Sequence, residues 1–553
     1  MKRVIVIGAG PGGLAAAINL AGLGLDVTVV EKDAVPGGRM KGLTFGENNE
    51  YSVDTGPSIL QLPGIYEALF ARVGKRIEDY VTLLRVDPNT RLHFWDRSTL
   101  DTTSDLDRMA AQCAKFGAEK GPAFTAWMRD SDKKYSIAYE KFIAHNAGSL
   151  DYYNPIRLLP TLPYRPWETL YTQLDRYFHD DRINYALAYP SKYLGLHPTT
   201  CSSVFSVIPY IELAFGVWHV KGGFRELARG MKKCAEDLGA RFRMSSPVAQ
   251  LWIEEDPNNK SKPRTRGVIL TSGERLEADA VVVNADLPYA SKNLIPARYR
   301  RFGRTSDTAL DHAKYSCSTF MLYLGIDKVY GPEEGAAHHM IYLSESARRT
   351  DRDALEDRTI DLEDPPFYVC NPALTDPDPA GAPKGHSTLY VLVPVPNTHN
   401  AVDWKFAEKT LLERVPQWLE KVGLKDVAKH IVAKRAFTAE TWRDEFNVFR
   451  GAVFNLSHTW LQLGPTRPRV ESPDVAGLYW VGGGTHPGSG LLTIIESANI
   501  AADYISRASG MGALPLWPYV PQVGGPKLQP LQRATRRGAV ARHEASVDPA
   551  PGP

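Results

Sequence analysis

Residues 3–31 read RVIVIGAGPGGLAAAINLAGLGLDVTVVE, a stretch in which several structural signals follow one another closely. The apolar runs at 4–7 and 27–30 predict two strands, and the alanine-rich stretch between them predicts a helix. A strand, a glycine-rich turn, a helix and a second strand form a unit that binds dinucleotides, with the phosphates at the helix N-terminus. The stretch therefore predicts an α/β nucleotide-binding domain.

Four residues of this unit have specific tasks. Gly8 permits the tight turn, Gly10 lets the backbone approach a pyrophosphate, and Gly13 lets the helix lie close to the sheet. Glu31 ends the second strand, where a carboxylate accepts hydrogen bonds from a ribose diol. The order of the elements, more than the glycines alone, predicts nucleotide binding.

A secretory signal is the alternative interpretation of the first apolar run, because Lys2 and Arg3 precede it. The glycine cluster and Asp26 interrupt the run before any cleavage site, which favours the nucleotide-binding interpretation. No window of ~18 uninterrupted apolar residues predicts a transmembrane helix.

The composition is that of a globular protein with two or three domains. The 553 residues are 43% hydrophobic and 10% aromatic, enough to fill more than one core. The 65 basic and 63 acidic residues leave a net charge of +2, so we expect no nucleic-acid partner. The cysteines lack C-x-x-C spacing, which predicts free thiols in a reducing cytoplasm and neither disulfides nor a metal site. They are Cys113, Cys201, Cys234, Cys317 and Cys370.

A second glycine pair indicates which dinucleotide is bound. Residues 37–39 read GGR and residues 54–57 read DTGP. A unit that binds a nicotinamide cofactor does not require a second glycine pair after the acid that binds the ribose. FAD is longer and buried, so it requires a second place where the backbone can come close to the cofactor, and a cation nearby. Gly37 and Gly38 can supply the approach, and Arg39 the charge near the phosphates or the flavin. An exposed loop arginine is the alternative for Arg39.

A third glycine-rich turn, at 482–490, joins an apolar strand at 477–481 to a helical run over 491–505. A helix N-terminus at such a turn is an anion-binding geometry, and its amides can face the negative charge of a reduced flavin. A plain strand-to-helix turn is the alternative.

The rest of the chain alternates between two kinds of segment. Residues 106–215 have a helical pattern, whereas 216–290 return to strands, among which Val248 can pair with an adenine edge. We expect an α/β fold in which a Rossmann-type FAD-binding domain is interleaved with a mixed α+β substrate domain. The FAD-binding domain is expected at 1–105, 216–290 and 450–508, an apolar-substrate and membrane-facing domain at 106–215 and 291–449, and a disordered tail at 509–553.

Residues 152–171 are crowded with proline, leucine and aromatic residues. They form either a buried connector or a surface that dips into the bilayer interface. The basic residues of the tail either contact anionic lipid or are simply solvated.

These elements together resemble the bacterial and fungal phytoene desaturases and the dehydrosqualene desaturases. The resemblance extends from Met1 to about Arg507, and the GTHPG sequence at 484–488 is its most specific element. Other elements that carry it are the three glycine motifs of the first 57 residues, residues 206–223 and residues 315–318. The glycine motifs are shared with amine oxidases, which implies an amine-oxidase-like architecture. Residues 490–496 differ from the Gly-Ile-Pro or Gly-Val-Pro of many relatives, so the substrate and the number of desaturation steps stay open.

The resemblance implies an FAD enzyme that removes two hydrogens from a C–C bond of a long, apolar polyene. FAD takes a hydride, and a base or water takes the neighbouring proton. It also implies a cytoplasmic protein associated peripherally with the inner face of a membrane, and an electron acceptor such as quinone or oxygen. The candidates for the base or for cation stabilisation are Glu212, His219, His486 and Glu496. The residues expected to bind FAD are Gly8, Gly10, Gly13, Glu31, Gly38, Arg39, Gly56, Pro57, Val248, Gly483, Gly484, Thr485 and Leu492.

Three alternatives stay open. A flavin amine oxidase would share the cofactor domain but admit a polar amine. A carotenoid or lipid carrier would keep an apolar tunnel without the flavin. Within the family, a carotenoid isomerase or a terminal-methyl oxygenase is the nearest competitor.

Overall fold

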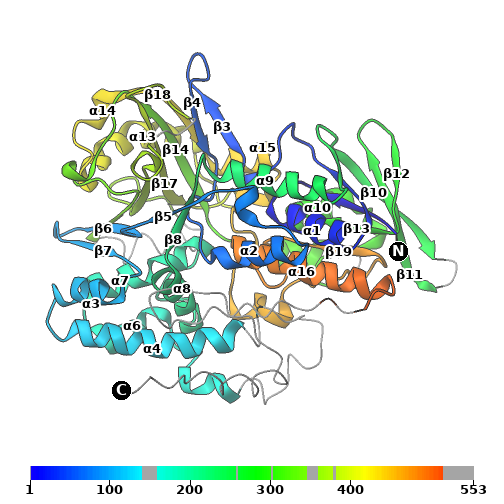
Figure 1. The fold of residues 1–553 in the computed structure, drawn as a ribbon, viewed down its shortest axis with the longest axis horizontal. Helices are drawn as coiled ribbons and strands as arrows, with labels where there is room; N and C mark the ends of the chain where they lie inside the picture. The colour runs from blue at the N-terminus through cyan, green and yellow to red at the C-terminus, as the bar shows by residue number, and fades with distance from the viewer. Residues whose placement is uncertain are drawn as a thin grey trace, which may run out of the picture.

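The computed structural model describes residues 2–139, 143, 159–256, 259–300, 303–345, 359–377, 381–512 and 514. In Figure 1 the N-terminal unit lies on the right, a second large sheet lies at the upper left, and a group of helices lies below that sheet. The predicted tail lies outside the described residues beyond 514.

A five-stranded parallel sheet carries the N-terminal unit. Its order is β19-β13-β1-β2-β9. The strands are β1 (Arg3–Ile7), β2 (Asp26–Val30), β9 (Arg241–Arg243), β13 (Ala280–Val283) and β19 (Leu478–Trp480). Because β1 pairs with β2 on one side and with β13 on the other, the strand order reverses at β1. Ligands of open α/β sheets bind at the carboxyl ends of the strands at such a point, and the first glycine turn lies there.

Helix α1 (Pro11–Gly22) is buried along most of its length, as its alanine-rich sequence allows. It packs against α16 (Leu491–Ala508), which closes the sheet from the other end of the sequence (Figure 1). The strand, turn, helix and strand predicted for residues 4–30 are therefore confirmed.

A seven-stranded mixed sheet forms the second layer, in the order β18-β14-β17-β16-β15-β6-β7. The strands are β6 (Thr90–Phe94), β7 (Thr99–Thr102), β14 (Ser318–Ile326), β15 (His339–Leu343), β16 (Phe367–Cys370), β17 (Ser387–Val395) and β18 (Ile431–Phe437). Every residue of β14 is buried. By sheet membership, β6 and β7 go with this layer, whereas the sequence placed them in the FAD-binding segment 1–105.

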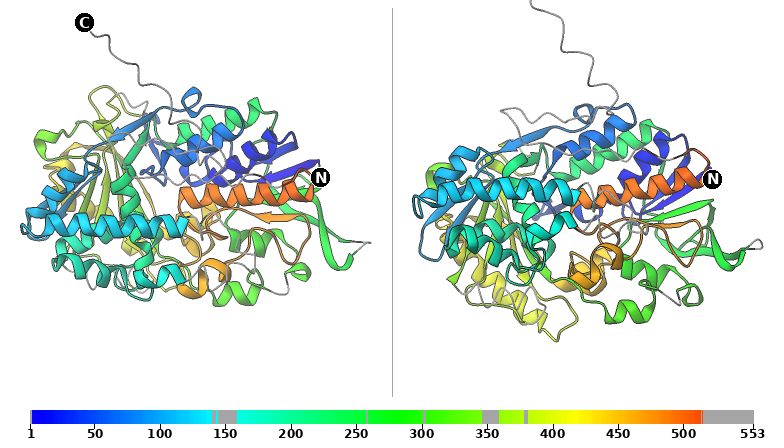
Figure 2. Two further views of the ribbon diagram at one scale, coloured as in Figure 1. Left: turned by 60° about the horizontal axis from the view of Figure 1, so that its bottom comes forward. Right: turned by 90° about the horizontal axis from the view of Figure 1, so that it is seen from below.

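Helices cover the space below the second sheet, as predicted for 106–215. They are α3 (Leu106–Ala114), α4 (Lys120–Ala138), α6 (Leu170–Phe178), α7 (Asp181–Ala188) and α8 (Val207–Phe215). Figure 2 shows α4 and α16 lying end to end, and at their junction the Tyr139 hydroxyl donates to Glu496 Oε1 at 2.8 Å. The helical layer is thereby joined to α16, which packs on the helix of the N-terminal unit.

The smaller elements complete the two layers. Three antiparallel groups are β3 (Gly42–Phe45) with β4 (Tyr51–Asp54), β5 (Leu83–Val86) with β8 (Val217–Val220), and β10 (Val248–Asp256) with β11 (Asn259–Leu270) and β12 (Arg275–Glu277). The remaining α-helices among the described residues are α2 (Pro63–Arg72), α9 (Phe224–Asp237), α10 (Leu287–Leu294), α11 (Asp307–His312), α13 (Trp404–Trp418), α14 (Val427–His430) and α15 (Ala439–Phe446).

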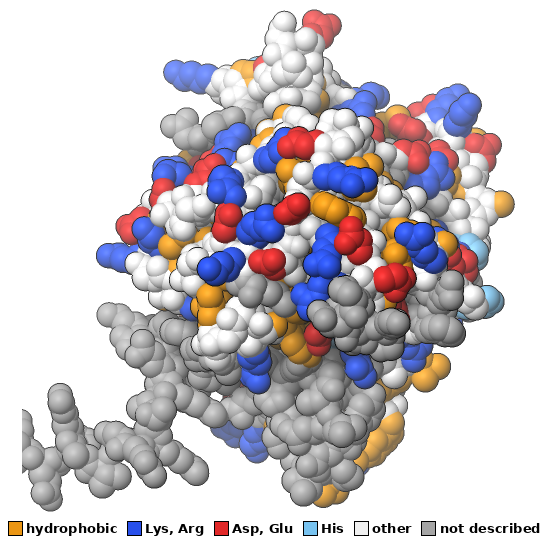
Figure 3. Space-filling view, turned by 90° about the vertical axis from the view of Figure 1, so that its right-hand side faces the viewer, with side chains coloured by type: hydrophobic (Ala, Val, Ile, Leu, Met, Phe, Trp, Pro, Cys, Tyr) orange, Lys and Arg blue, Asp and Glu red, His pale blue; other side chains and the backbone are white. Residues whose placement is uncertain are grey.

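The surface mixes charges of both signs. On the face in Figure 3, basic and acidic side chains are interspersed. Within the described part of the chain, no helix combines the length and the apolarity that crossing a bilayer requires.

Candidate functional site

One large cavity, of about 980 Å³, extends between the two layers. Residues of the N-terminal unit line one end of it, and apolar residues of the helical layer line the other. The first group includes Gly8, Gly10, Glu31, Gly38, Arg39, Gly56, Pro57 and Val248, and residues Gly482–Gly484 and Leu492 belong to the same wall. Eleven of the thirteen residues expected to bind FAD line this cavity, whereas Gly13 and Thr485 do not.

The first glycine turn is shaped by close backbone contacts. Gly8 has a φ of +94°, which side chains rarely allow, and a Cβ on Gly13 would lie 2.0 Å from the carbonyl oxygen of Gly8. Asn284, at the end of β13, donates from Nδ2 to the same carbonyl at 3.3 Å. A Cβ on Gly10 would lie 2.9 Å from Asn284 Nδ2. Asn284, which no motif of the sequence predicts as a site residue, therefore closes the turn.

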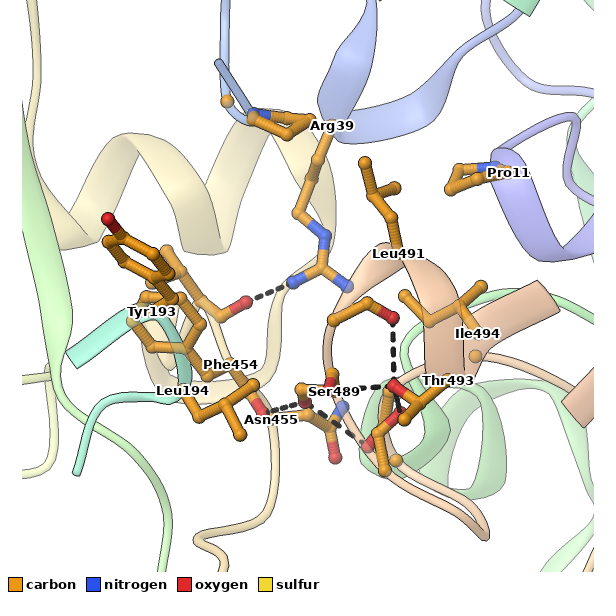
Figure 4. A pocket seen from close by; sticks show the side chains of 18 of the residues that line it. Pro11, Arg39, Tyr193, Leu194, Phe454, Asn455, Ser489, Leu491, Thr493 and Ile494 are labelled. Atoms are coloured by element: carbon orange, nitrogen blue, oxygen red, sulfur yellow. Dashed lines mark hydrogen bonds between the residues drawn. The ribbon is translucent and has the colours of Figure 1, made fainter. Parts of the chain in front are cut away.

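Two helix N-termini meet at this cavity. The N-cap residues of α1 and α16 are Gly10 and Gly490, and neither helix has a side-chain cap or an acidic residue in its first turn. A Cβ on Gly12 would lie 2.9 Å from Ile494 Cγ2, so the two helix starts are in direct contact. Figure 4 labels Pro11 at the start of α1 and Ile494 in the first turn of α16. Unsatisfied amides and two helix dipoles make this wall favourable for an anion.

Glu31 is buried at the edge of the turn. Its Oε2 accepts from the Ala9 amide at 2.6 Å and its Oε1 from the Asp33 amide at 2.9 Å. Burial raises the pKa of Glu31, although these two amides oppose the rise. Each carboxylate oxygen can accept a second hydrogen bond, as a ribose diol requires.

The second glycine pair lies on the first turn. The Gly37 amide donates to the Ala9 carbonyl at 2.8 Å, and a Cβ on Gly56 would lie 2.4 Å from the Arg39 carbonyl oxygen. The Arg39 guanidinium extends into the cavity toward Leu491 (Figure 4) and donates to the Val453 carbonyl. The alternative of an exposed loop arginine is wrong, because Arg39 reaches inward.

Asp286 is an acid of this wall that was not among the residues expected from the sequence. It caps α10, accepting from the Tyr289 amide at 3.2 Å, and it accepts from Asn455 Nδ2 at 2.5 Å. Burial raises its pKa to about 6, and the charge of Arg39 opposes this rise. An acid before Leu-Pro at 287–288 is a helix-start signal that could have located it.

Arg467 binds the third glycine turn, at 482–490, and is not itself part of the cavity lining. Its buried guanidinium donates to the carbonyls of Gly483 at 2.6 Å and Thr485 at 3.2 Å. Burial lowers its pKa to about 9. Thr485 turns its hydroxyl to the Pro468 carbonyl at 2.8 Å and does not reach the cavity wall, whereas Gly483 and Gly484 do.

The four candidates for proton transfer lie in different places. His486 lines the cavity, and Glu212 lies behind two lining residues, with its Oε2 accepting from Gln61 at 3.2 Å and Tyr193 at 3.3 Å. Burial raises the pKa of Glu212 to about 7. The structure does not bring the other two to the cavity.

His219 and Glu496 are held by other groups. His219 Nε2 lies 3.7 Å from Asp376 Oδ2, and burial lowers its pKa. Glu496 accepts from Tyr139 and from Asn499 Nδ2 at 3.2 Å, so its carboxylate is occupied in the junction of α4 and α16.

The other end of the cavity is apolar. Its wall includes Ile137, Tyr164, Val204, Phe205, Ile208, Ile211 and Trp460. Lys134 is a polar residue in this region, with its ammonium donating to Ser206 Oγ at 2.9 Å and its pKa lowered to about 7 by burial. This end suits a ligand without a polar handle.

Comparisons with known proteins agree with this geometry. The family of flavin containing amine oxidoreductases matches residues 11–506. The chain is 67% identical to the all-trans-zeta-carotene desaturase of Myxococcus xanthus, over 94% of this chain and 96% of that protein. It is 36% identical to the zeta-carotene-forming phytoene desaturase of the same organism, over 93% and 96%.

Solved structures support the architecture. A putrescine oxidase bound to putrescine superposes with a TM-score of 0.57 at 16% identity, covering 92% of this chain and 99% of that one. The predicted amine-oxidase-like α/β architecture is thereby confirmed.

Proposed function

Because the chain belongs to the carotenoid desaturases of the flavin-containing amine oxidoreductase family, we propose that its substrate is ζ-carotene, into which it introduces further C=C bonds. The chain is an FAD-dependent oxidoreductase that acts on CH–CH groups of a linear carotenoid precursor. The observation that carries the choice of substrate is the contrast between 67% identity to a ζ-carotene desaturase and 36% identity to a ζ-carotene-forming phytoene desaturase.

The wall around the two helix starts fits FAD. We propose that Gly8, Gly10 and the start of α1 hold the pyrophosphate, and that Glu31 holds the ribose. Val248 would lie at the adenine, and Arg39, Gly484 and Leu492 would lie near the flavin. The uncapped helix starts and the glycine positions where a Cβ would fill the cradle support this assignment. When bound, FAD supplies the acceptor for the hydride that the substrate loses.

The chain's own residues then have to position an apolar polyene and take up a proton. Burial of apolar surface, at roughly 25 cal/mol per Å², is the interaction available to a hydrocarbon in the wall of Phe205, Ile208 and Ile211. Among the proton-transfer candidates we retain His486, in the wall, and Glu212, behind Gln61 and Tyr193. A carboxyl with a pKa of about 7 can both accept and release a proton near neutral pH.

The test is a choice between two substrates. Purified, FAD-loaded protein is mixed with liposomes that contain either ζ-carotene or phytoene, and the pigments are separated by chromatography with absorbance detection. We expect ζ-carotene to be converted to products that absorb at longer wavelength, with phytoene left unchanged. Equal consumption of both, or conversion of phytoene alone, would refute the proposed substrate. The same reaction with and without oxygen or an added quinone tests our expectation that one of these accepts the electrons.

We also propose peripheral association with a membrane, because the polyene resides in the bilayer. Several large apolar side chains are exposed on segments that also line the apolar end of the cavity. They are Leu159 (58% exposed), Leu162 (47%), Trp167 (64%), Trp460 (59%) and Leu461 (78%). Exposed apolar groups beside a cavity mouth are typical of surfaces that enter the bilayer interface.

Liposome co-sedimentation tests this surface with a matched control. We expect the double variant Leu162→Asp, Leu461→Asp to lose most of its liposome binding. Phe406→Asp changes an equally exposed apolar residue on α13 and should leave the binding unchanged. If both variants bind like the unchanged protein, the membrane contact is elsewhere; residues 152–158, part of the predicted stretch, lie outside the described residues.

A further inference from the structure

Three buried side chains with metal-binding atoms lie together away from the large cavity. His338 directly precedes β15, His339 begins this strand, and Cys370 ends β16. His339 and Cys370 are directly opposed in the antiparallel pairing of these strands. The two imidazoles and the thiol each offer a ligand atom, and these atoms lie within 4.8 Å of one another. The three residues are at most 5% exposed.

Each imidazole is held through one nitrogen only. His338 Nδ1 lies 2.6 Å from Thr375 Oγ1, and His339 Nδ1 lies 2.7 Å from the Tyr368 hydroxyl. Among the described residues, neither Nε2 has a hydrogen-bond partner, although both are buried. Imidazoles that bind a metal typically donate from the other nitrogen to a polar group in this way, because that bond fixes the tautomer.

The hydrogen bonds of the cluster leave ligand atoms for a cation. Each ring uses Nδ1 for a side-chain partner, and among the described residues nothing bonds to either Nε2. A small cavity of about 50 Å³ borders Cys370, His219 and Asp376, which leaves room for a water molecule. A purely structural packing of the rings would leave two buried nitrogens unsatisfied, at roughly 1–3 kcal/mol each.

We propose that His338, His339 and Cys370 bind a zinc ion that ties β15 to β16. Two nitrogens and a sulfur suit Zn²⁺ better than Mg²⁺ or Ca²⁺, which prefer oxygen. Zn–N and Zn–S bonds in a tetrahedral site place the ligand atoms about 3.5 Å apart. The side chains close in by about 1 Å when the ion binds, and water takes the fourth position. Cys370 binds as the thiolate and releases its proton to solvent.

No sequence motif predicts this site, because its residues come together only through the pairing of strands in the sheet. The adjacent histidines and Cys370 are far apart in the chain and show none of the short spacings of common zinc motifs. Tyr368, which holds His339, also lines the large cavity. The ion would therefore stabilise part of the substrate wall without touching substrate.

The experiment uses untagged, FAD-loaded full-length protein. After dialysis with zinc, elemental analysis should give about one zinc per chain. Replacement of zinc by Co²⁺ should give the strong visible bands of a tetrahedral site and a near-ultraviolet charge-transfer band from a thiolate. Cys370→Ala should lose the charge-transfer band and at least tenfold in zinc affinity, whereas Cys234→Ala, a buried cysteine on α9, should lose neither.

The cobalt spectrum of the unchanged protein decides the question even if Cys370→Ala fails to fold. Absence of zinc after dialysis, or a cobalt spectrum without the thiolate band, overturns the proposal. Equal cobalt spectra of the two cysteine variants overturn it as well. Desaturase activity is not among the readouts, so the outcome is independent of the proposed substrate.

Discussion

Replacement of Glu212 by glutamine should make the protein more stable at alkaline pH, relative to the unchanged chain, than at acidic pH. Glu212 lies on α8 and is 3% exposed. Burial raises the pKa of its carboxyl from 4.5 to about 7. Gln61 and Tyr193 both donate to the same oxygen, so an amide oxygen in its place can keep both hydrogen bonds.

The sign and the size follow from proton linkage. A carboxyl whose pKa is raised by folding contributes its full stability below pH 4.5, and that contribution is lost as the pH rises through about 7. With about 1.36 kcal/mol for each pH unit, ionisation lowers the free energy of unfolding by roughly 3 kcal/mol at pH 8 and by less than about 1 kcal/mol at pH 5. Glu212→Gln removes this pH-dependent part alone.

Urea denaturation at pH 5 and pH 8, with FAD at the same saturation, measures the difference. We expect the free energy of unfolding of Glu212→Gln, minus that of the unchanged chain, to increase by roughly 2–3 kcal/mol between the two values of pH. Glu413→Gln, an exposed position on α13, should give a difference that does not change with pH. Parallel pH dependences of Glu212→Gln and the unchanged chain would refute the reasoning.

Three further variants test the cofactor wall. Gly10→Leu should purify without flavin absorbance, because its side chain would occupy the pyrophosphate position; a full flavin spectrum would contradict this assignment. Arg467→Met should lower the free energy of unfolding by about 3 kcal/mol or more, since the carbonyls of Gly483 and Thr485 lose a charged donor, and thermal melts without added FAD measure it. Glu31→Ala should weaken FAD binding by about tenfold or more in fluorescence titration; an unchanged dissociation constant would remove Glu31 from the ribose site.

Local patterns predicted the elements of the cofactor domain well. The runs at 4–7, 27–30 and 280–283 are buried parallel strands, because an apolar run in a sheet covered on both faces needs no alternation. Local sequence patterns did not predict that β6 and β7 belong to the seven-stranded sheet. Their partner β15 begins at His339, far along the chain, and no local pattern records that pairing.

The sequence predicts those residues of the candidate site whose motif requires a particular backbone conformation. It does not predict the residues whose role depends on contacts with other segments of the chain. Gly8 and Gly13 are needed for the turn itself, so the sequence alone located them. Asn284 acts by a hydrogen bond to the carbonyl of Gly8, 276 residues away in the chain. Arg467 bonds the carbonyl of Gly483 from a separate loop 16 residues earlier, and no local motif predicts that contact. Glu496 was one of the candidates for the base, but its carboxylate accepts hydrogen bonds from Tyr139 and Asn499 and lies outside the cavity lining.

The position of β19 at the edge of the five-stranded sheet has a consequence for biosynthesis. β19 and α16 leave the ribosome roughly 450 residues after β2, which at about 5–20 residues per second is roughly 20–90 s later. Until then the free edge of β13 and the face of α1 that α16 covers are exposed to other chains. Chaperone protection during translation is therefore expected, because the wall that the start of α16 shares with the start of α1 is completed only after this interval.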